Sequence, residues 1–107
     1  MKTSRITGIG HYLPDKILTN DELTNLVETS DEWIFSRTGI KQRHIANDDE
    51  YTSELAIKAS IKAIANSKVS AREIDYIILA TTTPDETFPS TATRVQEALK
   101  IGNKPAF

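Results

Sequence analysis

The stretch Asp75-Tyr-Ile-Ile-Leu-Ala-Thr-Thr82 decides the fold that this sequence predicts. It contains a continuous apolar run with β-branched residues, which is typical of a strand buried on both faces. Such a strand belongs to a parallel sheet that helices cover on both sides. The loop that follows, residues 83–89, lies at the carboxyl end of the strand, where open α/β sheets bind ligands. We therefore expect an α/β domain with a parallel core.

The residues around this strand predict helices that cover it. From Tyr51 or Thr52 to about Ser67, isoleucines recur at helical spacing. The many alanines between them indicate a helix that lies close against a sheet or another helix. The other elements expected in this half are a single capped turn at 70–73, a helix that Ser90 caps and that runs to about Lys100, and the start of another strand at 104–107.

The first half of the chain predicts one strand and two short helices. Residues 5–13 alternate around Gly8 and Gly10 and are typical of a strand that ends at Pro14. Because the third glycine of a dinucleotide-binding motif is missing, we interpret these glycines as positions of bending or close packing. The elements expected next are a helix that Thr19 and Glu22 open as a capping box and that runs through Val27, a helix that Ser30 starts and Gly39 ends in a left-handed turn, and an extended piece from Ile40 to Ile45 with exposed Lys41 and Arg43.

The second of these helices carries the only tryptophan of the chain. Thr29, Trp33 and Arg37 are four residues apart, which would place them on one helical face. An indole ring offers a stacking surface, and a guanidinium group can stack or grip phosphate, so the three suit a flat anionic ligand such as a nucleotide. The alternative is that Trp33 anchors the core and Arg37 lies over its ring, and composition alone favours that reading.

The composition excludes several classes of function. Thirteen basic and fifteen acidic residues give a net charge of −2, which argues against a general nucleic-acid binder. The absence of cysteine excludes disulfides, thiolate metal sites and a Cys nucleophile within this chain. His11 and His44 lack the spacing of a zinc site, so no metal is expected. No apolar run could span a membrane and no signal core follows Met1, so we expect a soluble, cytoplasmic protein.

Several stretches together resemble bacterial β-ketoacyl-acyl-carrier-protein synthase III, in order and over essentially the whole chain. The most specific is Thr29-Ser-Asp-Glu-Trp-Ile34, followed by Arg37-Thr-Gly-Ile40. The others are Gly10–Pro14 with Thr19-Asn20, Arg43-His44, Ile78–Asp85, Phe88-Pro-Ser90 and Pro105-Ala-Phe107.

This resemblance implies a thiolase-like fold, which is a five-layered αβαβα enzyme that works as a homodimer. Residues 1–107 would form an incomplete amino-terminal portion of that domain, with a parallel buried strand and flanking helices. The implied activity is that of an acyltransferase, which condenses acetyl-CoA or another acyl-CoA with malonyl-acyl carrier protein to start fatty acid biosynthesis. Acyl-CoA is then a substrate, and no cofactor is expected.

The resemblance also implies roles for individual residues. Thr29, Trp33 and Arg37 match CoA-binding positions, with Trp33 packed against the adenine. Phe88 matches an aromatic residue that reaches across the dimer to shape the acyl pocket, and Thr82 matches a residue near that pocket. The Cys, His and Asn that catalyse the family's reaction have no counterpart in residues 1–107. No catalytic residue is therefore assigned, and the chain alone is expected to be inactive.

Two classes of function remain open. The first is the amino-terminal third of a condensing enzyme, either truncated or one piece of a split gene. The second is a non-catalytic α/β module that binds CoA or a carrier protein, or that is only a scaffold. Under the family resemblance, the basic side chains of Lys41 and Arg43 are candidate contacts to an acidic carrier protein. Glu86 departs from the family's pattern, which leaves the acyl-chain preference open. We expect partial disorder or aggregation in isolation, because a parallel strand would lack neighbours.

Overall fold

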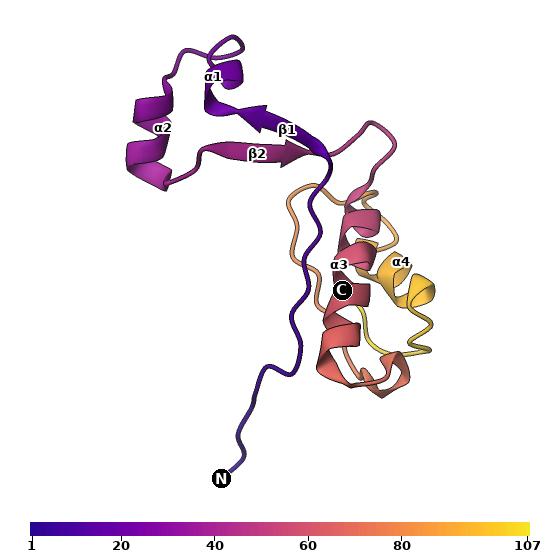
Figure 1. Cartoon of the computed structure of the whole chain (residues 1–107). Helices are drawn as coiled ribbons and strands as arrows, with labels where there is room; N and C mark the ends of the chain where they lie inside the picture. Colours follow the sequence, from indigo (N-terminus) through magenta and orange to yellow (C-terminus); the bar gives the residue numbers. More distant parts are fainter. The chain divides into compact units, whose positions relative to one another are not determined.

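The computed structural model describes all 107 residues, which form two compact units (Figure 1). The hairpin unit is Leu13–Asp49, and the helical unit combines Met1–Tyr12 with Glu50–Phe107. The hairpin unit contains β1 (Lys16–Thr19), α1 (Asn20–Leu23), α2 (Asp31–Thr38) and β2 (Gln42–Ile45). The helical unit contains α3 (Thr52–Ser67), the single 3-10 turn η1 (Ala71–Glu73) and α4 (Thr91–Ala98).

The two strands of the hairpin unit pair antiparallel. Lys16 lies opposite Ile45 at one end of the ladder, and Thr19 lies opposite Gln42 at the other. The extended piece predicted at 40–45 is therefore confirmed as β2. The strand β1 was not predicted, because Lys16–Thr19 is short and its last residue, Thr19, was assigned only to the start of the following helix.

The capping signals of the hairpin unit are confirmed. Thr19 and Glu22 form the predicted capping box at the start of α1. Ser30 caps α2 by accepting a hydrogen bond from the backbone N–H of Trp33, and Gly39 ends the helix with φ of 70°. The predicted extension of α1 through Val27 is wrong, because the helix stops at Leu23 and continues only as turns. The side chains beyond that point are exposed, so no apolar contact holds a longer helix.

In the helical unit, α3 lies very close to the extended segment 1–12. A Cβ atom on Gly10 would meet the carbonyl oxygen of Ala59 and the backbone nitrogen of Ala63. A Cβ atom on Gly8 would meet the same residue, Ala63, and also Ser67. The expectation that the alanines and glycines mark close packing is therefore confirmed. The helix also packs against α4.

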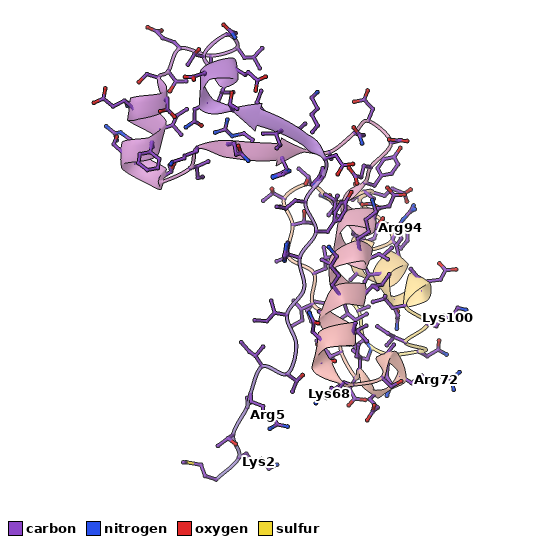
Figure 2. The ribbon with its side chains drawn as sticks, viewed as in Figure 1. Lys2, Arg5, Lys68, Arg72, Arg94 and Lys100 are labelled. Atoms are coloured by element: carbon purple, nitrogen blue, oxygen red, sulfur yellow. The ribbon has the colours of Figure 1, made fainter.

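Polar contacts hold the same segment against α3. The Tyr12 hydroxyl donates to Glu50 at 2.6 Å, and Lys58 donates to that hydroxyl at 3.0 Å and to Glu50 at 2.9 Å. The carboxylate of Glu50 raises the pKa of Lys58. Other charged side chains of this unit, such as Lys68 and Arg72, are exposed at its surface (Figure 2).

The strand predicted over residues 5–13 is absent. This segment is extended but has no paired neighbour, and Ile6 and Ile9 are exposed. The alternating pattern describes a strand that needs a sheet beside it, and these residues contact a helix instead. The segment is thus positioned by side chains and glycines rather than by a hydrogen-bonded ladder.

The stretch 75–82 runs parallel to the end of the chain, as predicted. Ile77 donates to the Pro105 carbonyl at 3.0 Å, and Phe107 donates back to the Ile77 carbonyl at 3.1 Å. The prediction that this strand is buried on both faces is wrong for this chain, because Ile78 is 71% exposed. One parallel partner covers one edge only, and burial of both faces needs further layers. No helix is long and apolar enough to cross a membrane.

Candidate functional site

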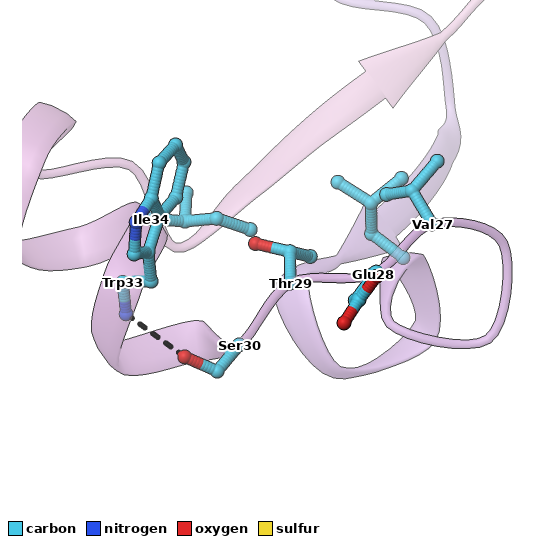
Figure 3. Close-up of a pocket in the computed structure, with 7 residues that line it drawn as sticks. Val27, Glu28, Thr29, Ser30, Trp33 and Ile34 are labelled. Atoms are coloured by element: carbon cyan, nitrogen blue, oxygen red, sulfur yellow. Dashed lines mark hydrogen bonds between the residues drawn. The ribbon is translucent and has the colours of Figure 1, made fainter.

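The hairpin unit contains a pocket of about 470 Å³ between α1 and the start of α2 (Figure 3). Its volume falls within the range of about 300–1,000 Å³ that is usual for small-molecule sites. The residues that line it are Leu23, Val27, Glu28, Thr29, Ser30, Trp33 and Ile34. Apolar side chains therefore form much of the wall, and a few polar groups are set among them.

The start of α2 places the indole ring at this pocket. The Ser30 hydroxyl lies 3.1 Å from the backbone nitrogen of Trp33, which fixes the first turn of the helix (Figure 3). Thr29 precedes this cap and does not belong to the helix. The predicted ladder of three residues on one helical face is therefore wrong at Thr29. Thr29 and Trp33 nevertheless line the same pocket, because the chain turns at Ser30.

Trp33 and Arg37 form a stacked pair on α2. The guanidinium carbon of Arg37 lies 4.7 Å from the centroid of the indole ring. Trp33 is 55% exposed, whereas its neighbour Ile34 is buried and anchors the helix. The alternative that Trp33 is a core anchor is therefore wrong for this chain, whereas its second part, that Arg37 lies over the ring, is confirmed. An indole with an exposed surface and a cation one turn away can take a flat anionic ligand.

The Thr29 hydroxyl is a second polar feature of the pocket. Its oxygen is buried and has no hydrogen-bond partner. In the close-up, this oxygen is directed toward Ile34 and Trp33 (Figure 3). Because buried polar groups in proteins are nearly always hydrogen-bonded, the hydroxyl is available to a ligand or a water molecule in the pocket.

Thr82 and Phe88, the other two candidate residues, belong to the helical unit. Both side chains are exposed, and Phe88 is 85% exposed. The loop that carries Phe88 is held firmly, since Asp85 accepts a hydrogen bond from the backbone of Ser53 at 2.9 Å and Thr52 donates to the Thr83 carbonyl at 2.6 Å. The structure thus presents a large aromatic ring on an anchored loop.

The expectation that Arg43 is exposed is wrong. Its guanidinium lies 2.5 Å from the Asn20 side-chain oxygen and also reaches the carbonyls of Leu18 and Thr19. Lys41 is exposed and lies over the ring of Phe35 at 5.4 Å. Arg43 is therefore an internal contact of the hairpin unit.

Sequence reasoning missed the second wall of the pocket and the residue that joins the walls. Leu23 and Val27 were expected within one helix, but α1 ends at Leu23 and the turns after it bring Val27 to the pocket. Asn20 was noted only at the start of that helix and in the pair Thr19-Asn20 of the family resemblance, and it was given no role of its own, yet it is 1% exposed. No group of acidic or histidine side chains in the chain could hold a metal ion.

Comparison with known proteins shows that the chain is similar to condensing enzymes. No protein-family model matches it. Beta-ketoacyl-acyl-carrier-protein synthase III of Ehrlichia canis is 62% identical over 107 residues, which cover 100% of this chain and 33% of the relative. The protein of the same name from Rickettsia canadensis is 58% identical over 105 residues, with 98% and 33% covered. The chain thus spans about a third of the length of these relatives.

A solved structure gives the same result. The crystal structure of 3-oxoacyl-acyl-carrier-protein synthase III from Aquifex aeolicus superposes with a TM-score of 0.85 at 48% sequence identity. The match covers 95% of this chain and 33% of that one. The fold is therefore that of the amino-terminal third of a thiolase-like condensing enzyme, as the resemblance implied.

Proposed function

We infer that this chain, which is homologous over its whole length to the amino-terminal third of bacterial β-ketoacyl-acyl-carrier-protein synthase III, is the CoA-binding part of such an acyltransferase. The enzyme would condense acetyl-CoA or another acyl-CoA with malonyl-acyl carrier protein and so start fatty acid biosynthesis. The observation that carries the proposal is the Trp33–Arg37 pair beside a pocket with an unpartnered hydroxyl.

The nucleotide end of CoA fits the chemistry of this pocket. Adenine is a flat aromatic ring that can stack on the exposed part of the Trp33 indole. The phosphates carry negative charge, and Arg37 offers a planar group of donors one helical turn away. The Thr29 hydroxyl would donate to or accept from the ligand inside the pocket.

The contribution of residues 1–107 to the reaction is binding and positioning. The family's Cys forms the acyl-enzyme, and its His and Asn stabilise the oxyanion and the enolate, but none of them has a counterpart here. In this proposal Thr82 lies near the acyl pocket, and Phe88 enters the pocket of a second subunit. The near-complete exposure of Phe88 on an anchored loop supports an interface role, because large exposed aromatic groups often mark contact sites.

The binding proposal is tested by calorimetric titration of CoA into a fusion enzyme, in which residues 1–107 replace the corresponding third of the Ehrlichia canis relative. We expect Trp33→Ala and Arg37→Ala each to weaken CoA binding about tenfold, since base stacking contributes about 1–3 kcal/mol and a hydrogen bond to a charged group about 1.5–3 kcal/mol. Arg72→Ala is the matched control, because Arg72 is exposed in the helical unit.

The enzymatic part is tested in the same fusion enzyme. We expect the fusion enzyme to condense acetyl-CoA with malonyl-acyl carrier protein, and the 107-residue chain alone to show no acyl transfer. CoA binding without activity in the fusion would favour a non-catalytic binding module. Unchanged CoA affinity on both Trp33→Ala and Arg37→Ala would remove the assigned site.

A further inference from the structure

We propose that Asn20 is a positioning residue for the CoA site, because it joins the two walls of the pocket through its side-chain amide. The inference rests on the function proposed above. Asn20 is the first residue of α1, which contributes Leu23 to one wall of the pocket. The other wall is the start of α2, which contributes Trp33 and Ile34.

The Asn20 amide makes three hydrogen bonds to three parts of the hairpin unit. Its Nδ2 donates to the Asp31 carboxylate at 2.7 Å and to the Ile40 carbonyl at 2.7 Å. Its Oδ1 accepts from Arg43 at 2.5 Å. The backbone N–H of Asn20 also donates to the Lys41 carbonyl at 3.1 Å. Asn20 is therefore bonded on all sides, which agrees with its nearly complete burial.

These bonds hold both ends of α2. Asp31 is the first residue of the helix, and Ile40 follows Gly39, the residue that ends it. The helix has only eight residues, of which Ile34 alone is buried. A helix this short and this exposed gains little from apolar packing, so polar contacts at its ends determine where it sits.

The residue type is suited to this place. The two acceptors around Nδ2 are a carboxylate and a carbonyl, and the group facing Oδ1 is a cation. Only an amide of this size supplies a donor to one side and an acceptor to the other. Aspartate at position 20 would set a carboxylate against Asp31 and against the Ile40 carbonyl. A buried mismatch of this kind moves the elements that face it.

The consequence is a shift of the stacked pair relative to the rest of the pocket. Trp33 and Arg37 are on α2, whereas Leu23 and Val27 come from α1 and the turns after it. If the amide contacts are lost, α2 keeps its own cap at Ser30 but is no longer tied to α1. The ring and the guanidinium then reach the ligand from a changed position, and CoA binds more weakly.

The test compares Asn20→Asp with an exchange of the two polar groups, Asn20→Asp combined with Asp31→Asn. In the exchange variant the new amide at position 31 donates to the carboxylate at position 20, and Arg43 keeps its acceptor. Asn25→Asp is the control, since Asn25 is exposed on the turn after α1. The measurements are the KM for acetyl-CoA, kcat and the affinity for CoA, all in the fusion enzyme.

We expect Asn20→Asp to raise the KM for acetyl-CoA about tenfold and to leave kcat within about twofold. This pattern follows when a change weakens binding of the substrate and of the transition state equally. The affinity for CoA should fall by a similar factor. The exchange variant should recover part of the loss in KM, because position 20 is tied to the start of α2 again while the Ile40 carbonyl still lacks a donor, and Asn25→Asp should leave both constants unchanged. Recovery by the exchange is not expected of a residue that only contributes stability.

Three results would overturn the inference. They are an unchanged KM in Asn20→Asp, a loss of kcat alone, and an exchange variant that folds but recovers nothing. If Asn20→Asp does not fold, the exchange variant decides the question. Failure of both to fold would also count against it, because a residue that positions one helix should not be needed for the whole fold. A neutral Asn20→Asp beside a weakened Trp33→Ala rejects only this inference, whereas a neutral Trp33→Ala rejects the CoA site itself.

Discussion

At the scale of single residues, Asp85 shows how one carboxylate can fix a loop. Its Oδ1 accepts from the backbone of Ser53 in the first turn of α3, and its own N–H donates to the Thr91 hydroxyl at 3.1 Å. Its Oδ2 is buried without a hydrogen bond and lies 3.8 Å from Nε of Arg94. A negative charge at the N-terminus of α3 is also favoured by the helix dipole. Asp85 therefore joins α3, α4 and the loop that carries Phe88.

Replacing Asp85 should loosen that loop. We expect Asp85→Ala to lower the free energy of unfolding by about 1–3 kcal/mol, because the Ser53 N–H loses its acceptor in a largely buried place. Asp85→Asn should lower the free energy of unfolding by less, since its amide oxygen can still accept the hydrogen bond from the Ser53 N–H. Urea unfolding followed by circular dichroism measures both.

Glu86 is the matched control for Asp85. It pairs with Arg94 at 2.5 Å, but half of its side chain is exposed. We expect Glu86→Ala to change stability by less than about 1 kcal/mol, as is usual for surface ion pairs. Equal losses in the free energy of unfolding at positions 85 and 86 would show that the buried contact to Ser53 adds no stability beyond that of a surface ion pair.

At the scale of elements, the packing of α3 depends on glycine in the segment beside it. We expect Gly10→Ala to destabilise the helical unit by about 1–3 kcal/mol, because the new methyl group would overlap backbone atoms of Ala59 and Ala63, which cannot rotate away. Thermal melting of the Gly10→Ala variant and of the parent protein measures this loss of stability. Gly102→Ala serves as the contrast, since nothing lies near its Cβ position and only its φ of 88° resists the change. A Gly10→Ala variant as stable as the parent would mean that the segment is not held against α3.

The start of α1 should respond to pH through Glu22. Hydrogen bonds from the backbone N–H and the hydroxyl of Thr19 lower the pKa of this carboxyl. A carboxyl with a lowered folded pKa contributes stability that is complete above its unfolded pKa and is lost as the pH falls through the folded value. The cap should therefore weaken only in acid. In NMR spectra, the amide signal of Thr19 should shift as the pH falls through the folded pKa of Glu22, and Glu22→Gln should abolish that shift. A Thr19 signal that titrates equally in Glu22→Gln would exclude this cause.

At the scale of the whole molecule, the chain leaves many large apolar side chains exposed. The most exposed among those beyond Met1 are Ile6, Ile9, Leu26, Ile78 and Phe88. Contiguous apolar surface and an unpaired strand edge favour association with other chains. The relatives that share this sequence are about three times as long, so they have further residues with which to cover such surfaces.

We expect the isolated 107-residue chain to bind a dye such as ANS and to self-associate at micromolar concentration. Light scattering after gel filtration measures the association. The fusion enzyme is the control, and it should bind less dye per molecule. A sharp cooperative melt of a soluble monomer without dye binding would contradict this expectation.

The sequence predicted the local features well, for a physical reason. Ser30 and Gly39 bracket α2 because capping depends on residues within one turn of the helix end. Burial of residues 75–82 was not predictable from that stretch, because burial depends on layers that are distant in sequence. The same holds for the candidate site. Spacing indicated Trp33 and Arg37, but the role of Asn20 depends on partners 11 to 23 residues away.

The pairing of β1 with β2 brings the two ends of the hairpin unit together, since Lys16 lies opposite Ile45. The chain therefore enters and leaves the hairpin unit through one short antiparallel ladder. All the residues that line the pocket lie within this unit. Such an arrangement suits recombination. An exchange of residues 13–49 between relatives would transfer all the residues that line the pocket at once, through two junctions that lie side by side.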